Sequence, residues 1–126
     1  MDSRSHYGIE LVLDLHECDT SKFNRDFIDL FLTDLCNLIG MVRCDVHFWD
    51  DVGVAPEGHQ TLPHAKGTSA ICFILTSSIV LHALDILGCV YLNIFSGKAF
   101  DVKVAEEFAR KRFGGRVVKS EVLDRF

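Results

Sequence analysis

The stretch Gly67-Thr-Ser-Ala-Ile-Cys-Phe-Ile-Leu-Thr-Ser-Ser-Ile-Val-Leu-His-Ala-Leu84 carries no Asp, Glu, Lys or Arg and is nearly long enough to cross a bilayer as a helix. However, serine, threonine and histidine interrupt it, and β-branched residues recur along it. This composition is typical of strands in a buried sheet. We therefore predict two strands, Ser69–Thr76 and Ser78–Leu84, and no membrane segment.

Strand and helix patterns flank this stretch on both sides. Apolar and polar residues alternate from Gly8 to His16, which indicates a strand. Apolar residues then recur at helical spacing, after possible N-cap oxygens on Asp19, Thr20 and Ser21 and as far as Gly40. A second helix is expected from Asp101 to Gly114. The other predicted strands are Val42–Trp49, Cys89–Phe95 and Arg116–Leu123.

The order of these elements predicts the fold class. It reads βαβ, a long loop, three strands, then αβ, which is typical of an α+β two-layer sandwich. Both helices are expected on one face of a largely antiparallel sheet. The length of 126 residues fits one domain covering residues 1–126.

Charge and cysteine content narrow the class of protein. The net charge is −5 and no block of Lys or Arg occurs, which argues against a nucleic-acid-binding surface. Five cysteines, with no CxxC pair, suggest neither a disulfide framework nor a thiolate zinc site. Residues 1–6 lack the apolar segment of a signal peptide. We therefore expect a protein of the reducing cytoplasm.

Two segments of the chain resemble the bacterial and archaeal S-adenosylmethionine decarboxylases. The stretch Leu11-Val-Leu-Asp-Leu-His-Glu-Cys-Asp19 looks like the first strand of that family. The second segment runs in step with the catalytic half of the family, through Gly67-Thr-Ser, Thr76-Ser77, His82, Gly88 and Asn93-Ile-Phe-Ser-Gly97. The resemblance covers nearly the whole chain, with a loop at residues 50–67 that is longer than in the family.

This resemblance implies a particular kind of enzyme. Members of the family are made as proenzymes that cut themselves before an internal serine and convert that serine into a pyruvoyl group. The pyruvoyl group acts as the electron sink for decarboxylation. The substrate implied is S-adenosylmethionine or a related amino acid, and the product feeds spermidine and hence polyamine biosynthesis. The family also implies a homodimer that pairs through its sheets.

The resemblance carries over to three positions. Ser77 matches the serine that becomes pyruvoyl, so cleavage is expected between Thr76 and Ser77. Ser69 matches a serine that assists processing, and His82 matches the histidine that serves as the processing base. In one regular strand, an odd offset of five residues would place Ser77 and His82 on opposite faces. We therefore expect a turn or bulge near Ser77 and Ser78.

Other positions depart from the family pattern. Ser78 replaces a histidine, Gly97 replaces the cysteine that reprotonates the product, and Ile86 replaces a glutamate that holds the ribose hydroxyls. These changes leave open a catalytically degenerate homologue that binds a ligand or regulates a partner. By residue type alone, Ser77 and Ser78 would be turn residues and His82 a core histidine.

The loop at residues 50–67 is a separate candidate site. It has no periodicity and is punctuated by Gly and Pro, and such long loops are often functional. A divalent metal ion would suit its imidazoles and carboxylates, although a solvated loop is the favoured interpretation. The aromatic pair Phe48 and Trp49 precedes the loop and could stack on a purine or cover the core. The possible metal ligands are His47, Asp50, Asp51, Glu57, His59 and His64.

Overall fold

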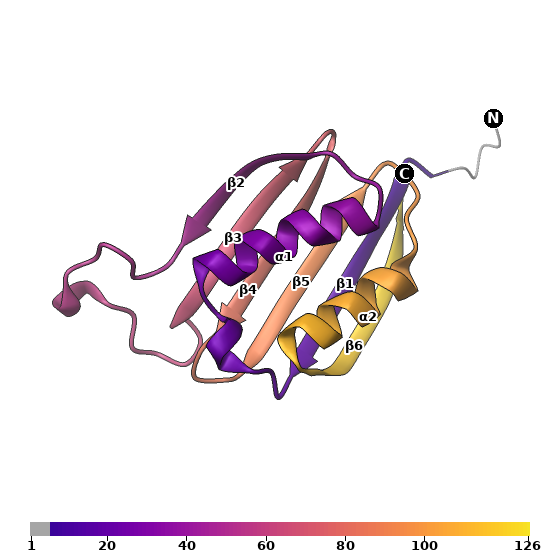
Figure 1. Cartoon of the computed structure of the whole chain (residues 1–126). Coiled ribbons are helices and arrows are strands. Elements are labelled where there is room, and N and C mark those ends of the chain that lie inside the picture. Colours follow the sequence, from indigo (N-terminus) through magenta and orange to yellow (C-terminus); the bar gives the residue numbers. More distant parts are fainter. Residues whose placement is uncertain (1–5) are drawn as a thin grey trace.

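The computed structural model of the chain describes residues 6–126 and contains six strands and two α-helices. Figure 1 shows the helices lying together on one face of a single sheet. This arrangement confirms the predicted α+β sandwich. The elements are β1 (Gly8–His16), α1 (Arg25–Leu38), β2 (Arg43–Trp49), β3 (Gly67–Ile74), β4 (Ser77–Leu84), β5 (Cys89–Ser96), α2 (Val102–Phe113) and β6 (Arg116–Arg125).

The strand order is β2-β3-β4-β5-β1-β6, and every neighbouring pair is antiparallel. Strands β2 to β5 follow one another along the chain, whereas β1 lies between β5 and β6. The predicted strands all form: β1 has the predicted ends, and no end of the other strands is shifted by more than two residues. Because β1 is paired on both sides, its alternating leucines are fully buried in the core.

The core lies between the sheet and the two helices. Leu11, Leu13 and Leu15 of β1 are fully buried, as are Ile79 and Leu81 of β4. From the helices, the ring of Phe31 meets that of Phe113 edge-on, with centroids 4.8 Å apart. The alternation along each strand leaves the opposite face of the sheet uncovered by any helix of residues 6–126.

The start of the first helix differs from the sequence prediction. Asp19 caps only a short 3₁₀ turn, by accepting a hydrogen bond from the Ser21 backbone N–H at 3.0 Å. The helix α1 begins after Asn24, whose side chain accepts from the Phe27 N–H at 2.9 Å. Phe23 is buried between the two turns, so the chain must turn inward before the helix can start.

The bend expected near Ser77 and Ser78 is wrong in its position. Strands β3 and β4 form a hairpin whose turn is Leu75–Thr76, and the pairing is regular from Ile74–Ser77 to Gly67–Leu84. The turn therefore precedes Ser77, and no bulge follows it. As a consequence, Ser77 and His82 occupy opposite faces of one regular strand.

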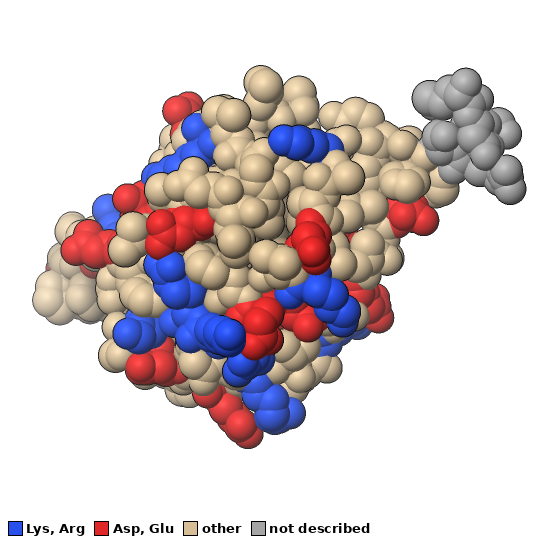
Figure 2. Space-filling model, turned by 45° about the vertical axis from the view of Figure 1, so that its right-hand side comes forward, with Lys and Arg blue, Asp and Glu red and all other residues tan. Residues whose placement is uncertain are grey.

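No helix in the described part of the chain is long and apolar enough to cross a membrane. On the surface, acidic and basic side chains are interspersed in the view of Figure 2, with no broad area of one sign. This distribution offers no cationic surface in that view for a phosphate backbone.

Candidate functional site

The uncovered face of the sheet carries the Ser69–His82 pair. Ser69 on β3 lies directly opposite His82 on β4, and the Ser69 hydroxyl is hydrogen-bonded to His82 Nδ1 at 2.6 Å. His82 is exposed, so its other ring nitrogen is accessible from this face. The structure thus brings together two of the three residues predicted to act in processing, as a base held by a hydroxyl group.

An open cavity of about 400 Å³ adjoins this pair and is lined by Trp49 and Phe48 from β2. The two aromatic residues play different parts. Trp49 is 76% exposed and points to the uncovered face, where it is free to stack on a flat ligand. Phe48 packs against the core and lies 5.8 Å below the Arg25 guanidinium. Of the two predicted substrate contacts, Trp49 has the suitable placement.

Ser77 and Thr76 lie at the far end of β4. Thr76 has a φ of 60°, in the left-handed region that β-branched residues rarely adopt. Ser77 is buried, and its hydroxyl accepts a hydrogen bond from the Gly97 N–H at 3.3 Å. A cavity of about 320 Å³ adjoins the Thr76–Ser77 bond and is walled by Phe73 and Phe95 from the uncovered face. The peptide bond expected to be cut therefore follows a residue in a strained backbone conformation and lies beside an open space.

Gly97 has a neighbour that the sequence did not reveal. A Cβ atom at Gly97 would lie 2.7 Å from the Tyr7 hydroxyl oxygen and 2.6 Å from its Cζ atom. The Tyr7 ring, stacked on Phe95 at a centroid distance of 6.0 Å, thus fills the space of the missing side chain. Ser96 is no substitute, because its buried hydroxyl donates to the Lys98 carbonyl at 2.7 Å.

The predicted catalytic residues do not meet within one copy of the chain. Ser77 and His82 are five positions apart on β4, which is roughly 16 Å along a strand. A general base must come within about 3 Å of the proton that it removes. His82 therefore cannot reach Ser77 in the same chain without breaking the hairpin.

Tyr91 is a further residue that the sequence analysis missed. It lies on β5 directly opposite His82, so the imidazole is flanked by Ser69 on one side and by a phenol on the other. Burial raises the pKa of the Tyr91 phenol above its ordinary value, which keeps it protonated and able to donate. Only the strand register, which places Tyr91 beside His82, could have indicated it.

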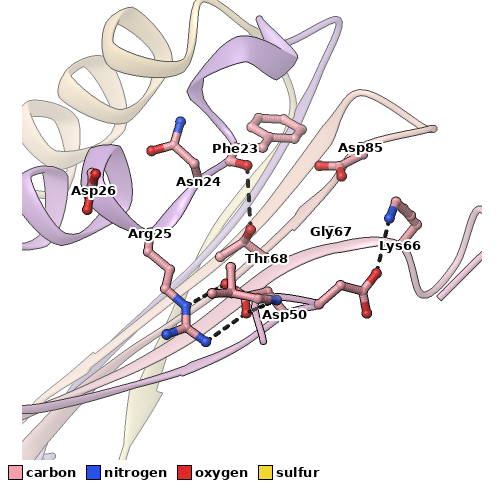
Figure 3. A pocket seen from close by; sticks show the side chains of 11 residues that line it. Phe23, Asn24, Arg25, Asp26, Asp50, Lys66, Gly67, Thr68 and Asp85 are labelled. Atoms are coloured by element: carbon pink, nitrogen blue, oxygen red, sulfur yellow. Dashed lines mark hydrogen bonds and ion pairs between the residues drawn. The ribbon is translucent and has the colours of Figure 1, made fainter. Parts of the chain in front are cut away.

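The largest cavity, of about 520 Å³, lies elsewhere, beside the start of α1 (Figure 3). Its lining includes none of Ser69, Ser77 and His82. Its charged residues are mostly paired. Arg25 donates two hydrogen bonds to Asp50, at 2.6 and 2.7 Å, and holds the pKa of that carboxyl below its usual value.

Polar contacts also hold the long loop at residues 50–67 in place. Asp51 accepts from Lys66 at 3.0 Å and from the Gln60 N–H, so the two ends of the loop are tied together. His59 Nε2 is hydrogen-bonded to the Val54 carbonyl at 2.7 Å. In residues 6–126, no three histidine, cysteine or acidic side chains are placed to share a metal ion. Two of the carboxylates considered as metal ligands, Asp50 and Asp51, thus anchor the ends of the loop.

Asp85 and Ile86 lie in the turn that follows β4. Ile86 is 56% exposed at the β4–β5 turn and contributes no polar group. Asp85 lines the polar cavity of Figure 3. Burial raises the pKa of the Asp85 carboxyl, against the opposing attraction of Lys66. Asp85 therefore does not replace the missing glutamate beside Trp49 or Ser77.

This architecture, an antiparallel sheet with two helices on one face and a serine–histidine pair on the other, defines an S-adenosylmethionine decarboxylase-like protein. The family model described as S-adenosylmethionine decarboxylase matches residues 9–126, so the chain belongs to this family. The crystal structure of the adenosylmethionine decarboxylase from Aquifex aeolicus is similar, with a TM-score of 0.73 and 15% identity over 96% of this chain and 92% of that chain. A search of curated proteins gave no match.

Proposed function

We propose that the chain cleaves itself between Thr76 and Ser77 and acts as a pyruvoyl-dependent decarboxylase of S-adenosylmethionine or a related amino acid. The observation that carries this proposal is the left-handed backbone of Thr76, with a φ of 60°, immediately before Ser77 and beside an open cavity. Attack of the Ser77 hydroxyl on the Thr76 carbonyl would give an ester. Elimination and hydrolysis would then consume one water, release ammonia and leave a pyruvoyl group.

Ser77 fits this role because it begins β4, where a new chain end would lie beside an open cavity. Its hydroxyl is held by only one backbone N–H, from Gly97. The pyruvoyl group would supply the electron sink that allows the substrate to lose carbon dioxide. The side chains around it would bind the substrate, exclude water and deliver protons.

A second copy of the chain would complete the site. His82 is too far from Ser77 within one chain, yet the cavities beside Ser77 and beside His82 both open on the uncovered sheet face. Ser77 itself points to the covered face, so it is the Thr76–Ser77 peptide bond that borders the cavity on the uncovered face. Two copies paired through the uncovered face in opposite orientations would bring His82 of one copy near that peptide bond of the other. The exposed Phe73 and Ile71 on the same face give such pairing an apolar contact.

Tyr7 takes the place of the missing cysteine in this proposal. Its hydroxyl occupies the position of a side chain at Gly97, next to Ser77. A phenol is a usable general acid, so Tyr7 can donate the proton that replaces carbon dioxide on the product. Tyr7→Phe keeps the stack on Phe95 but lacks the hydroxyl. It should slow turnover about 100-fold or more and leave self-cleavage unchanged.

The direct test uses carboxyl-labelled S-adenosylmethionine and measures the release of labelled carbon dioxide. Cleaved protein should release it, and Ser77→Ala should not. Mixing tests the composite site: Ser77→Ala supplies an intact His82, and His82→Ala supplies an intact Ser77. The mixture should cleave the His82→Ala chain faster than that variant cleaves alone. Cleaved protein that releases no carbon dioxide would count against the decarboxylase.

A second candidate is a non-catalytic homologue that binds a nucleoside-containing ligand. The exposed Ile86, which offers no carboxylate for ribose hydroxyls, favours it. The exposed Trp49 over its cavity supplies a stacking surface. Calorimetry with S-adenosylmethionine and the uncleaved Ser77→Ala protein should then show binding that Trp49→Ala abolishes. Absence of binding removes this candidate.

A further inference from the structure

The last strand, β6, forms one edge of the sheet and pairs with β1 on its inner side. It is ten residues long, and every residue except Val117 is exposed. A long exposed edge strand presents backbone N–H and C=O groups that can pair with another strand. Such edges are usually covered or interrupted, so the side chains of β6 indicate which partner it fits.

The sequence of β6 is complementary to itself when it is read in reverse. If two copies lie antiparallel with Ser120 opposite Ser120, Lys119 of each copy faces Glu121 of the other. Val118 then faces Val122, and both are about 40% exposed or more. Opposite charges and paired β-branched residues are favourable neighbours across antiparallel strands. Lys119 and Glu121 are two positions apart on the regular part of β6, so their backbone groups point the same way and can pair across the edge.

The complementarity ends at Val118, where the register between β1 and β6 shifts. Beyond the shift, Val117 lies opposite the buried Leu15, whereas Leu123 lies opposite Glu10, so the two point to opposite faces of the sheet. The contact therefore rests on the central pairs from Val118 to Val122.

Neighbouring registers place like charges together. A shift that centres the pair on Lys119 puts two lysines opposite each other, and a shift to Glu121 does the same with two glutamates. Like charges directly opposite are destabilising. The charges on β6 thus select one register among those that a flat edge would allow. The other edge strand, β2, is less complementary to itself, because centring it on Val46 sets Asp45 against a histidine, His47, and Arg43 against Trp49.

We propose that two copies of this chain pair through β6, antiparallel and centred on Ser120, so that one sheet continues across both copies. This contact is separate from the uncovered face and does not depend on self-cleavage. Where both contacts form, the edge contact doubles the number of copies in the assembly. The two charge pairs, Lys119 with Glu121 in each direction, fix the orientation.

Charge reversal tests this contact. Light scattering of Lys119→Glu, or of Glu121→Lys, should give half the mass of the unchanged protein, because each variant sets like charges opposite each other. An equimolar mixture of the two variants should return to the full mass, because every cross-strand pair is then opposite in charge. Equal masses for the unchanged protein and both single variants would overturn the proposal.

A disulfide tests the register independently of the charges. In a Cys44→Ser background, which removes the exposed cysteine, Ser120→Cys should form a covalent dimer under mild oxidation. Opposite Cα atoms on paired strands are about 4.5–5.5 Å apart, within the reach of a disulfide. The matched control is Val122→Cys, whose two copies would lie about 13 Å apart along the strand. A Ser120→Cys protein that stays monomeric on a denaturing gel, or that cross-links no faster than Val122→Cys, would contradict this register.

Discussion

Strand β4 carries a predicted processing residue near each end, His82 at one and Ser77 at the other, and the two ends differ in their surroundings. At one end, His82 keeps a hydroxyl partner, Ser69, at 2.6 Å, in the manner of a held base. At the other end, the Ser77 hydroxyl accepts a hydrogen bond from the Gly97 N–H at 3.3 Å, and Tyr7 fills the space beside Gly97. Residues at the spacing that the family pattern requires can therefore still lie far apart in one chain. In the proposed reaction, the attacking serine and its base would come from two copies of the chain.

The largest effect is expected from removing the hydroxyl group of Ser77. Ser77→Ala removes the attacking oxygen, so self-cleavage should stop completely and the chain should stay whole in a denaturing gel. Ser78→Ala is the matched control, because Ser78 is the next residue of β4 on the opposite face. It should still be cleaved. If Ser78→Ala blocked cleavage and Ser77→Ala did not, the assignment of the reactive serine would be wrong.

At the other end, His82→Ala should slow self-cleavage by about 100-fold to 10,000-fold, the usual contribution of a general base. Ser69→Ala should have a smaller effect in the same direction, because Ser69 acts only by holding the imidazole. The measurement is the rate of appearance of the shorter chains after a synchronised refolding. An unchanged cleavage rate in His82→Ala would mean that the Ser69–His82 pair takes no part in processing.

The strain at Thr76 predicts a smaller change, in stability. Thr76→Gly relieves a left-handed conformation and should raise the free energy of unfolding by about 1 kcal/mol. Cleavage of this variant should be slower, because less strain is released. Leu75→Gly is the control in the same turn, since Leu75 has no positive φ, and it should lower stability. Denaturant unfolding of uncleaved Ser77→Ala versions of both variants measures this.

The smallest effect concerns Asp85, which follows the His82 end of β4. Burial raises the pKa of its carboxyl in the folded state above the unfolded value of about 3.8. The folded state then holds the proton more tightly, so this group lowers stability as the pH rises above that value. Asp85→Asn should therefore stabilise the protein at pH 7 and have no effect at pH 3. A stabilisation that is equal at both pH values would contradict this origin.

Much of the fold follows from the sequence because its strands alternate cleanly. The leucines of β1 and the turn glycine Gly114, with a φ of 65°, each give an unambiguous local signal. The start of α1 does not, because Asp19 and Asn24 can both cap a helix. The burial of Phe23, a tertiary effect, decides between them.

The site was predictable in part. A turn at Leu75–Thr76 already implies that Ser69 faces His82, because hairpin pairing follows from the turn. The contact of Tyr7 with Gly97 joins residues far apart in the sequence through the register of β1 and β5. No local pattern contains that information.

The proposed self-cleavage before Ser77 is tested most directly by the intact mass of the freshly purified, denatured protein. We expect two chains, residues 1–76 and residues 77–126, the second beginning with a pyruvoyl group. A single species of 14.2 kDa that persists on prolonged incubation of the assembled protein would contradict it.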